Sequence, residues 1–140
     1  MGNTSRRIIA GILLISAPPF AGAESGIDGK GPLLCNFNRL ASCSQDAGAC
    51  VFRTPEDGNL PEFVEIDFSK KTVSGLWPKS QQRISKLNNL VVLEDRIVAQ
   101  GMDDNRPWSF VIDRSSGDFI GAGPAINEGV SIFGDCMPRQ

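Results

Sequence analysis

The chain has 140 residues, no His and no Tyr, and 14 Lys and Arg against 16 Asp and Glu, a formal net charge of −2. The lack of His excludes Ser-His-Asp and Cys-His catalysis and removes the commonest metal ligand. The acidic balance argues against nucleic acid, which binds basic patches. We therefore expect a protein that is not an enzyme and has no cofactor and no metal site.

The first 23 residues have the pattern of a secretory signal peptide. Arg6 and Arg7 supply the charged start, residues 8–15 form a short apolar run, and a small-residue cleavage site ends at Ala23. The apolar run is much shorter than the roughly 20 residues of a membrane span. We expect cleavage after Ala23 and export to the periplasm or the medium. Without Arg6 and Arg7 the chain keeps 12 basic and 16 acidic residues, a charge of −4.

The mature chain is predicted to be a single β domain over residues 33–140, preceded by a flexible, Gly-rich segment over residues 24–32. Short runs in which apolar and polar residues alternate recur through the domain, as they do in strands. Clusters of small, polar and turn-forming residues separate these runs. The predicted strands lie at residues 33–39, 50–53, 62–69, 72–77, 90–93, 97–100 and 130–133, and the predicted loops and turns at 41–49, 54–61 and 101–106.

Residues 79–89 fit two structures. Ile84, Leu87 and Val91 have helical spacing, and Ser80 could cap a short helix. A strand fits the neighbouring hairpins better, so we favour a strand for this stretch.

The clearest local pattern is a β-hairpin over residues 107–123. Trp108, Phe110 and Ile112 alternate with polar or outward-facing positions and predict an inward face. The turn that follows contains Gly117, which can adopt a positive φ without a steric clash. We expect Gly121, Gly123 and Pro124 to end the second strand. We interpret Trp108 as a core residue in preference to a platform on which a ligand stacks.

Four Cys in an exported chain predict two disulfides. We favour Cys43–Cys50, a short local loop, and Cys35–Cys136, which would tie the first strand to the last. A zinc site is disfavoured because the spacing lacks paired C-x₂₋₄-C units. About eight short strands with turns at short intervals then indicate an all-β fold, a small antiparallel barrel or a strongly coiled sheet.

Carboxylates are the remaining candidates for chemistry. Asp103 and Asp104 with Asn105 could form part of a calcium site, and Glu94-Asp95 or Asp113 with Asp118 could act as an acid–base pair. Each group lies where turns favour Asp or Asn, so we interpret all of them as turn residues.

The size, the disulfides and the lack of a catalytic motif favour a non-catalytic, protein-binding or inhibitory module of the cell envelope, without a membrane span and monomeric. Its general build resembles that of small periplasmic barrels that inhibit lysozymes or proteases, a likeness from which no residue is carried over. Small rigid domains bind through displayed loops. The candidate binding residues are Glu56, Asp57, Asn59, Asp103, Asp104, Asn105 and Arg106.

Two other functions remain open. The first is a carrier of a small molecule or lipid, which requires a cavity inside the barrel. The second is a hydrolase that uses carboxylates, which requires two acids in one cleft and a raised pKa for one of them.

Overall fold

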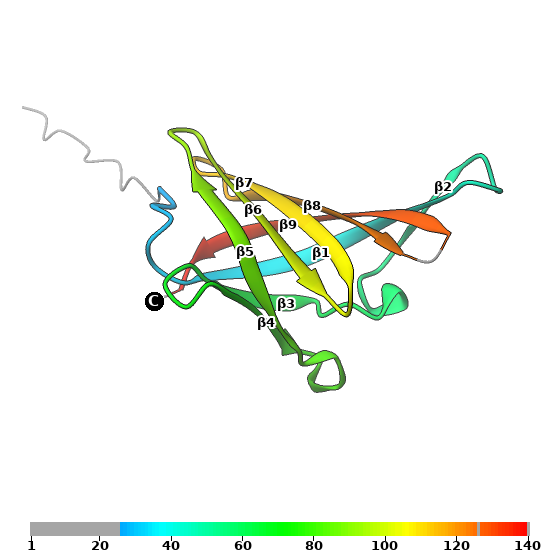
Figure 1. The fold of residues 1–140 in the computed structure, drawn as a ribbon, viewed down its shortest axis with the longest axis horizontal. Helices are drawn as coiled ribbons and strands as arrows, with labels where there is room; N and C mark the ends of the chain where they lie inside the picture. The colour runs from blue at the N-terminus through cyan, green and yellow to red at the C-terminus, as the bar shows by residue number, and fades with distance from the viewer. Residues whose placement is uncertain (1–25, 126, 140) are drawn as a thin grey trace, which may run out of the picture.

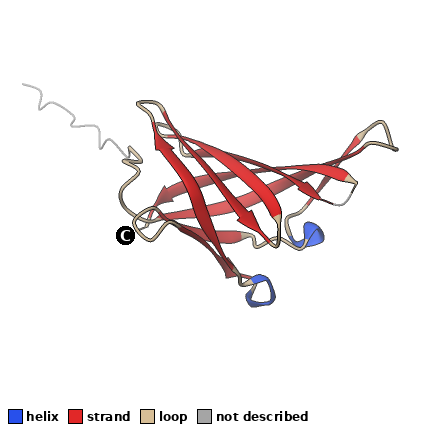
Figure 2. Ribbon diagram, in the orientation of Figure 1, coloured by secondary structure: helices blue, strands red, loops and turns tan. Residues whose placement is uncertain are grey.

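The structure, a computed structural model, describes residues 26–125 and 127–139, so the predicted signal peptide over residues 1–23 lies outside the described part. Nine strands and two single turns of 3₁₀ helix follow one another along the chain (Figures 1 and 2). None of the described helices is long and apolar enough to cross a membrane. The elements are β1 (Leu33–Ser44), β2 (Cys50–Arg53), η1 (Glu56–Gly58), β3 (Phe63–Asp67), β4 (Thr72–Trp77), η2 (Lys79–Gln81), β5 (Ile84–Val92), β6 (Arg96–Asp103), β7 (Arg106–Asp113), β8 (Asp118–Ala125) and β9 (Glu128–Pro138).

The sheet closes because its first and last long strands pair. Neighbouring strands are antiparallel in the order β2-β1-β3-β4-β5-β6-β7-β8-β9, and β1 also pairs with β9 along its whole length. Eight strands, β1 and β3 to β9, therefore form a closed barrel, and β2 is an additional strand on the second half of β1. The predicted small antiparallel barrel is confirmed.

Both disulfides join residues that lie directly opposite each other on paired strands. Cys35 of β1 is bonded to Cys136 of β9, and Cys43 of β1 to Cys50 of β2. The first bond spans 101 residues of sequence across the barrel closure, and the second spans 7. The predicted connectivity is confirmed.

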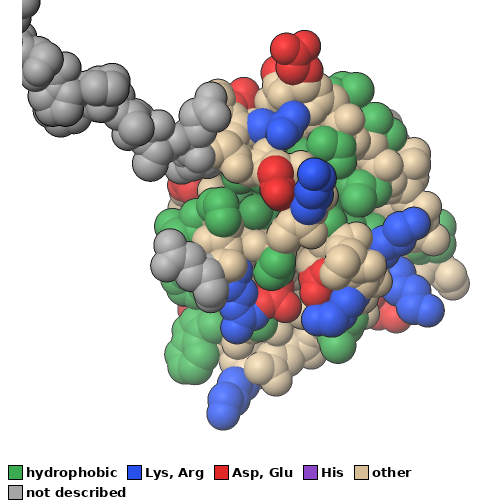
Figure 3. Space-filling view, turned by 90° about the vertical axis from the view of Figure 1, so that its left-hand side faces the viewer, with side chains coloured by type: hydrophobic (Ala, Val, Ile, Leu, Met, Phe, Trp, Pro, Cys, Tyr) green, Lys and Arg blue, Asp and Glu red, His purple; other side chains and the backbone are tan. Residues whose placement is uncertain are grey.

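One end of the barrel is filled by the segment that precedes β1. Ile27 is 2% exposed and packs in the hydrophobic core. Arg114, in the β7–β8 turn, donates from Nε to the Ile27 carbonyl at 2.7 Å and from Nη1 to the carbonyls of Leu93 and Glu94. We expected residues 24–32 to precede the fold as a flexible segment, but part of it is anchored inside. Figure 3 looks onto this closed end, where basic, acidic and hydrophobic side chains are interspersed.

β1, β8 and β9 are longer than the sequence predicts. β1 continues to Ser44, into the predicted loop over residues 41–49, and β9 covers Glu128–Pro138 where we expected only residues 130–133. β8 continues through its glycines and Pro124 to Ala125 instead of ending at them. All three lie where neighbouring strands supply backbone partners, and this tertiary context overrides weak local β propensity.

The predicted turn over residues 101–106 is much shorter in the structure. β6 runs to Asp103 and β7 starts at Arg106, so only Asp104 and Asn105 form the turn. Their φ angles of 46° and 63° are typical of a two-residue type I′ turn, which matches the twist of a hairpin.

Residues 79–89 contain both of the structures that we considered. η2 occupies the start, and β5 begins at Ile84, so the favoured strand is correct from that residue onward. Ser80 lies inside the 3₁₀ turn and does not cap it. The strand forms because β4 and β6 pair with β5 on its two sides.

The β7–β8 hairpin has the predicted turn chemistry. The Asp113 carboxylate accepts hydrogen bonds from the backbone N–H groups of Ser115 and Ser116, each at 2.9 Å, and from the Ser115 hydroxyl. Gly117 has a φ of 84°, and a Cβ there would lie 2.3 Å from the Cys136 carbonyl oxygen. Only glycine fits this position, because the turn packs directly on β9.

The two disulfides should stabilise the fold unequally. Loss of the long-range bond in Cys35→Ala/Cys136→Ala should cost about 4 to 5 kcal/mol, and loss of the local bond in Cys43→Ala/Cys50→Ala about 2.5 kcal/mol, because a longer loop restricts the unfolded chain more. Urea unfolding of both variants under non-reducing conditions measures this. Equal losses, or a larger loss from the local pair, would contradict the prediction.

The Asp113 turn should make stability depend on pH. The hydrogen bonds from Ser115 and Ser116 lower the pKa of the Asp113 carboxyl from 3.8 to about 2. Its contribution to stability is therefore fully present above pH 3.8 and is lost as the pH falls toward 2. Asp113→Asn should lower the melting temperature at pH 7. The difference in melting temperature between this variant and the unaltered protein should disappear as the pH falls from 3.8 toward 2.

Asp46→Asn is the matched control for this measurement, because the Asp46 carboxylate makes no hydrogen bond or salt bridge among the described residues. It should leave the melting temperature unchanged at every pH. A difference for Asp113→Asn that stays constant down to pH 2 would show that the charge of the carboxylate is not what stabilises the turn.

Candidate functional site

The barrel interior is hollow at the end opposite Ile27. A cavity of about 360 Å³ opens there. Asp103 and Arg106 of the β6–β7 hairpin, Glu128 of the β8–β9 hairpin and residues 58–61 after η1 border it. The volume lies within the range of roughly 300 to 1,000 Å³ that is typical of small-molecule sites.

Small residues occupy several of the inward-facing positions around the cavity. Gly121 lies opposite Phe110 on one side and Ile132 on the other, in a row that faces the interior. At the closed end the corresponding rows hold isoleucines, of which Ile97 and Ile112 are fully buried. The small residues that line the cavity are Gly75, Ser85, Gly121, Gly123 and Ala125.

Aromatic rings form one wall of the cavity. The rings of Trp108 and Phe110 are stacked, with their centroids 5.9 Å apart. The ring centroids of Phe110 and Phe119 lie 5.2 Å apart, and those of Phe119 and Phe37 lie 4.8 Å apart. All four residues line the cavity. Gly101 makes room for the indole, since a Cβ there would lie 2.1 Å from a ring carbon of Trp108. Trp108 packs against the core as predicted, and it also faces the cavity.

Charged side chains are confined to the mouth of the cavity. Three arginines, Arg53, Arg83 and Arg106, and two acids, Asp103 and Glu128, are among its lining residues. Nη1 of Arg83 lies 3.4 Å from the Asp103 carboxylate. Glu128 accepts a hydrogen bond from the buried Ser42 hydroxyl. Arg53 and Arg106 form no salt bridge with any carboxylate of the described residues.

The segment after η1 is held at the mouth by Gln81, the last residue of η2, and by Arg83, which follows it. Asn59 has a left-handed backbone with a φ of 56°. Its carbonyl oxygen accepts from Nη2 of Arg83, and its side-chain oxygen accepts from Nε2 of Gln81, both at 2.5 Å. Arg83 thus joins Asn59 to Asp103 and fixes two sides of the rim relative to each other.

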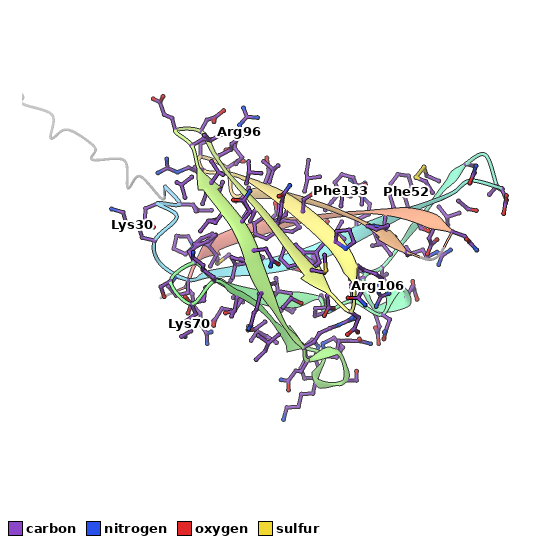
Figure 4. All side chains as sticks on the ribbon, viewed as in Figure 1. Lys30, Phe52, Lys70, Arg96, Arg106 and Phe133 are labelled. Atoms are coloured by element: carbon purple, nitrogen blue, oxygen red, sulfur yellow. A yellow bond between two sulfur atoms is a disulfide. The ribbon has the colours of Figure 1, made fainter. Side chains whose placement is uncertain are left out.

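The candidate binding residues divide into two groups. Asn59, Asp103 and Arg106, far apart in sequence, come together around the mouth. Figure 4 shows Arg106 at the end of the β6–β7 hairpin, beside η1. The others, Glu56, Asp57, Asp104 and Asn105, do not line the cavity. Their participation in binding stays a prediction.

The acid–base hypothesis gains no support from the carboxyls that it named. Asp95 has a lowered pKa because Arg96 donates hydrogen bonds to it, and Asp113 has a lowered pKa through its turn. A general acid needs the opposite shift. No cluster of three or more metal-binding side chains occurs among residues 26–125 and 127–139. Asp104 and Asn105 form the β6–β7 turn, and Asp103 is paired with Arg83.

A second feature lies on the outside of the barrel. Exposed or half-exposed hydrophobic side chains lie opposite one another on successive strands. The row ends beside Arg39, whose Cζ lies 5.4 Å from the ring centroid of Phe52 and 5.2 Å from that of Phe133. Figure 4 labels these two phenylalanines. The acids Asp113, Asp118 and Asp135 lie two residues from members of this row, on the same outer face. We call the row the outer stripe; it comprises Val91, Val98, Val111, Ile120 and Phe133.

Sequence reasoning missed most of the cavity. Gly121 and Gly123 were predicted to end a strand, although their spacing of two puts both on one face of it, where they allow Phe119 and Trp108 to pack closely. Arg53 and Arg83 were not considered, because nothing local distinguishes a rim arginine from a solvated one. Arg106 was included only as part of a turn.

Comparison with known proteins gives no relative: no family model, no curated protein and no solved structure matches this chain.

Proposed function

We propose that the protein is a non-catalytic carrier that binds one small, largely apolar molecule in the open end of its barrel. The cavity of about 360 Å³ carries this proposal. Its wall is aromatic and aliphatic, its charges lie at the rim, and it opens to solvent on the side away from Ile27. This combination of an apolar interior with a few polar groups at one place is typical of small-molecule sites.

The proposed location of the protein is the cell envelope or the medium. Two disulfides are compatible with an oxidising compartment, and the first 23 residues have the pattern of an export signal.

Occupation of the cavity can be tested with N-phenyl-1-naphthylamine, a neutral probe that becomes fluorescent in apolar surroundings. The protein should bind it at one saturable site. Ser85→Phe, which places a ring at a small inward position, should weaken binding by about tenfold or more, corresponding to about 1.4 kcal/mol. Ile84→Phe is the matched control: it introduces the same side chain one residue away, at a position that is 72% exposed, and should leave binding unchanged.

Equal binding by both variants would place the probe outside the cavity. A lack of saturable binding by the unaltered protein would contradict the carrier function. Melting temperatures of both variants, measured in parallel, show whether a loss of binding follows from a loss of folding.

The outer stripe supports a second candidate function, a binding module for another protein. Val111 is 39% exposed and Ile120 is 53% exposed on adjacent strands. Apolar patches of this kind mark interaction sites. Asp118 and Asp135 lie opposite each other beside the stripe and make no salt bridge with a described residue. The surface fits a protein partner whose apolar strip is bordered by Lys or Arg.

This second function is tested by capture from an envelope extract with immobilised protein. A specific partner should be retained by the unaltered protein and by Ser74→Asp, which adds a charge to β4 outside the stripe, but lost with Val111→Asp/Ile120→Asp. Asp118→Asn/Asp135→Asn should weaken capture and reduce its salt dependence. A partner retained by the double stripe variant would contradict the proposed surface, while probe binding in the cavity reports separately on the carrier function.

A further inference from the structure

We infer that the ligand of the cavity is an amphipathic carboxylate, whose head group is bound by Arg53 and Arg106 and whose apolar body lies along the aromatic wall. This inference rests on the proposed carrier function and adds the chemical class of the ligand. Its basis is the pair of guanidinium groups at the mouth that have no carboxylate partner among the described residues.

The strand register directs both arginines toward the cavity. Arg53 of β2 lies opposite Leu40 of β1, whose side chain is buried and lines the cavity. Arg106 is two residues before Trp108 and four before Phe110, so all three share one face of β7. The two guanidinium groups therefore belong to the same interior rows as the hydrophobic lining.

The other charges at the mouth form no salt bridge with the two arginines, although Asp103 lies opposite Arg106 in the strand register. Arg83 and Asp103 form a salt bridge with each other, and Arg83 also donates to the Asn59 carbonyl. Glu128, beside the β8–β9 turn, accepts from Ser42 of β1. The charges of Arg83 and Asp103 cancel. The two other arginines and Glu128 then leave the mouth with an excess of one positive charge.

Arginine side chains suit this task. A guanidinium presents several donors in one plane and can bind both oxygens of a carboxylate, with hydrogen bonds that are strengthened by charge. Both arginines are exposed, so a carboxylate bound there would remain close to solvent and would not suffer the desolvation cost of a buried ion. The tail would extend past Trp108 toward Phe110 and Phe119, which have no polar atoms to hydrate.

A series of ligands with one tail and three head groups tests the inference. Isothermal titration at pH 7.4 and low ionic strength, below micelle-forming concentrations, compares decanoate, 1-decanol and decylammonium. Decanoate should bind about tenfold more tightly than 1-decanol, since charge-assisted hydrogen bonds add to the same apolar contact. Decylammonium should bind least tightly, because the mouth has an excess of positive charge.

Variants assign the preference to the two arginines. Arg53→Gln/Arg106→Gln should reduce the affinity for decanoate to that for 1-decanol and leave 1-decanol binding unchanged. Glu128→Gln should tighten decanoate binding. Arg39→Gln, on the outer face beside Phe52 and Phe133, is the matched control and should change neither ligand.

The outcomes separate this inference from the carrier function. If the three ligands bind alike, or if the double arginine variant keeps the preference for decanoate, the inferred head-group site is wrong and the carrier function stands. A preference for decylammonium would assign the head-group site to Glu128 and overturn the inference. If none of the three ligands and no neutral probe binds, both the carrier function and its ligand class are wrong.

Discussion

The pairing of β1 with β9 is the constraint on which the rest of the structure depends. It converts a row of hairpins into a closed barrel and pairs β1 with β9 from Leu33–Pro138 to Ser44–Glu128, with one irregularity between Phe37 and Arg39. Cys35 and Cys136 lie within this ladder, and so does the contact of Gly117 with the Cys136 backbone. β1 and β9 stay paired beyond the residues of β1 that pair with β3. There β2 pairs with β1, and this places Arg53 beside the mouth of the cavity.

Closure also gives the barrel two unlike ends. Large β-branched side chains, together with Ile27 from the segment before β1, fill one end, and Arg114 holds this segment in place through backbone carbonyls. At the other end a cavity opens, with Gly, Ser and Ala among its lining residues and arginines and acids around its rim. A barrel of this size is commonly filled by its own side chains; here one end is filled and the other is hollow.

The cavity changes the order of the functional hypotheses. The sequence favoured a protein-binding module because disulfides, small size and the lack of His are all compatible with one. It gave less support to a carrier, because a cavity cannot be recognised from local sequence pattern. The structure supplies a specific place for a small molecule and, on the opposite side of the β-sheet, an exposed apolar row beside acids that form no salt bridge within the described part of the chain. The two surfaces are separate, since one faces the barrel interior and the other faces solvent, so both functions can belong to one molecule.

The sequence by itself determined the all-β class and the inward face of the central hairpin, because these follow from alternation and turn chemistry. It favoured one of the three possible disulfide pairings, which the structure confirmed. Only the tertiary structure decided how far β1, β8 and β9 extend, because their backbone partners come from distant strands. It alone brought Asn59, Asp103 and Arg106 to one rim, although the sequence had marked each as part of a loop. The roles of Gly121 and Gly123 also depended on it: local pattern shows a glycine, and only the neighbouring side chains show whether it ends a strand or lets a ring pack closely against the backbone.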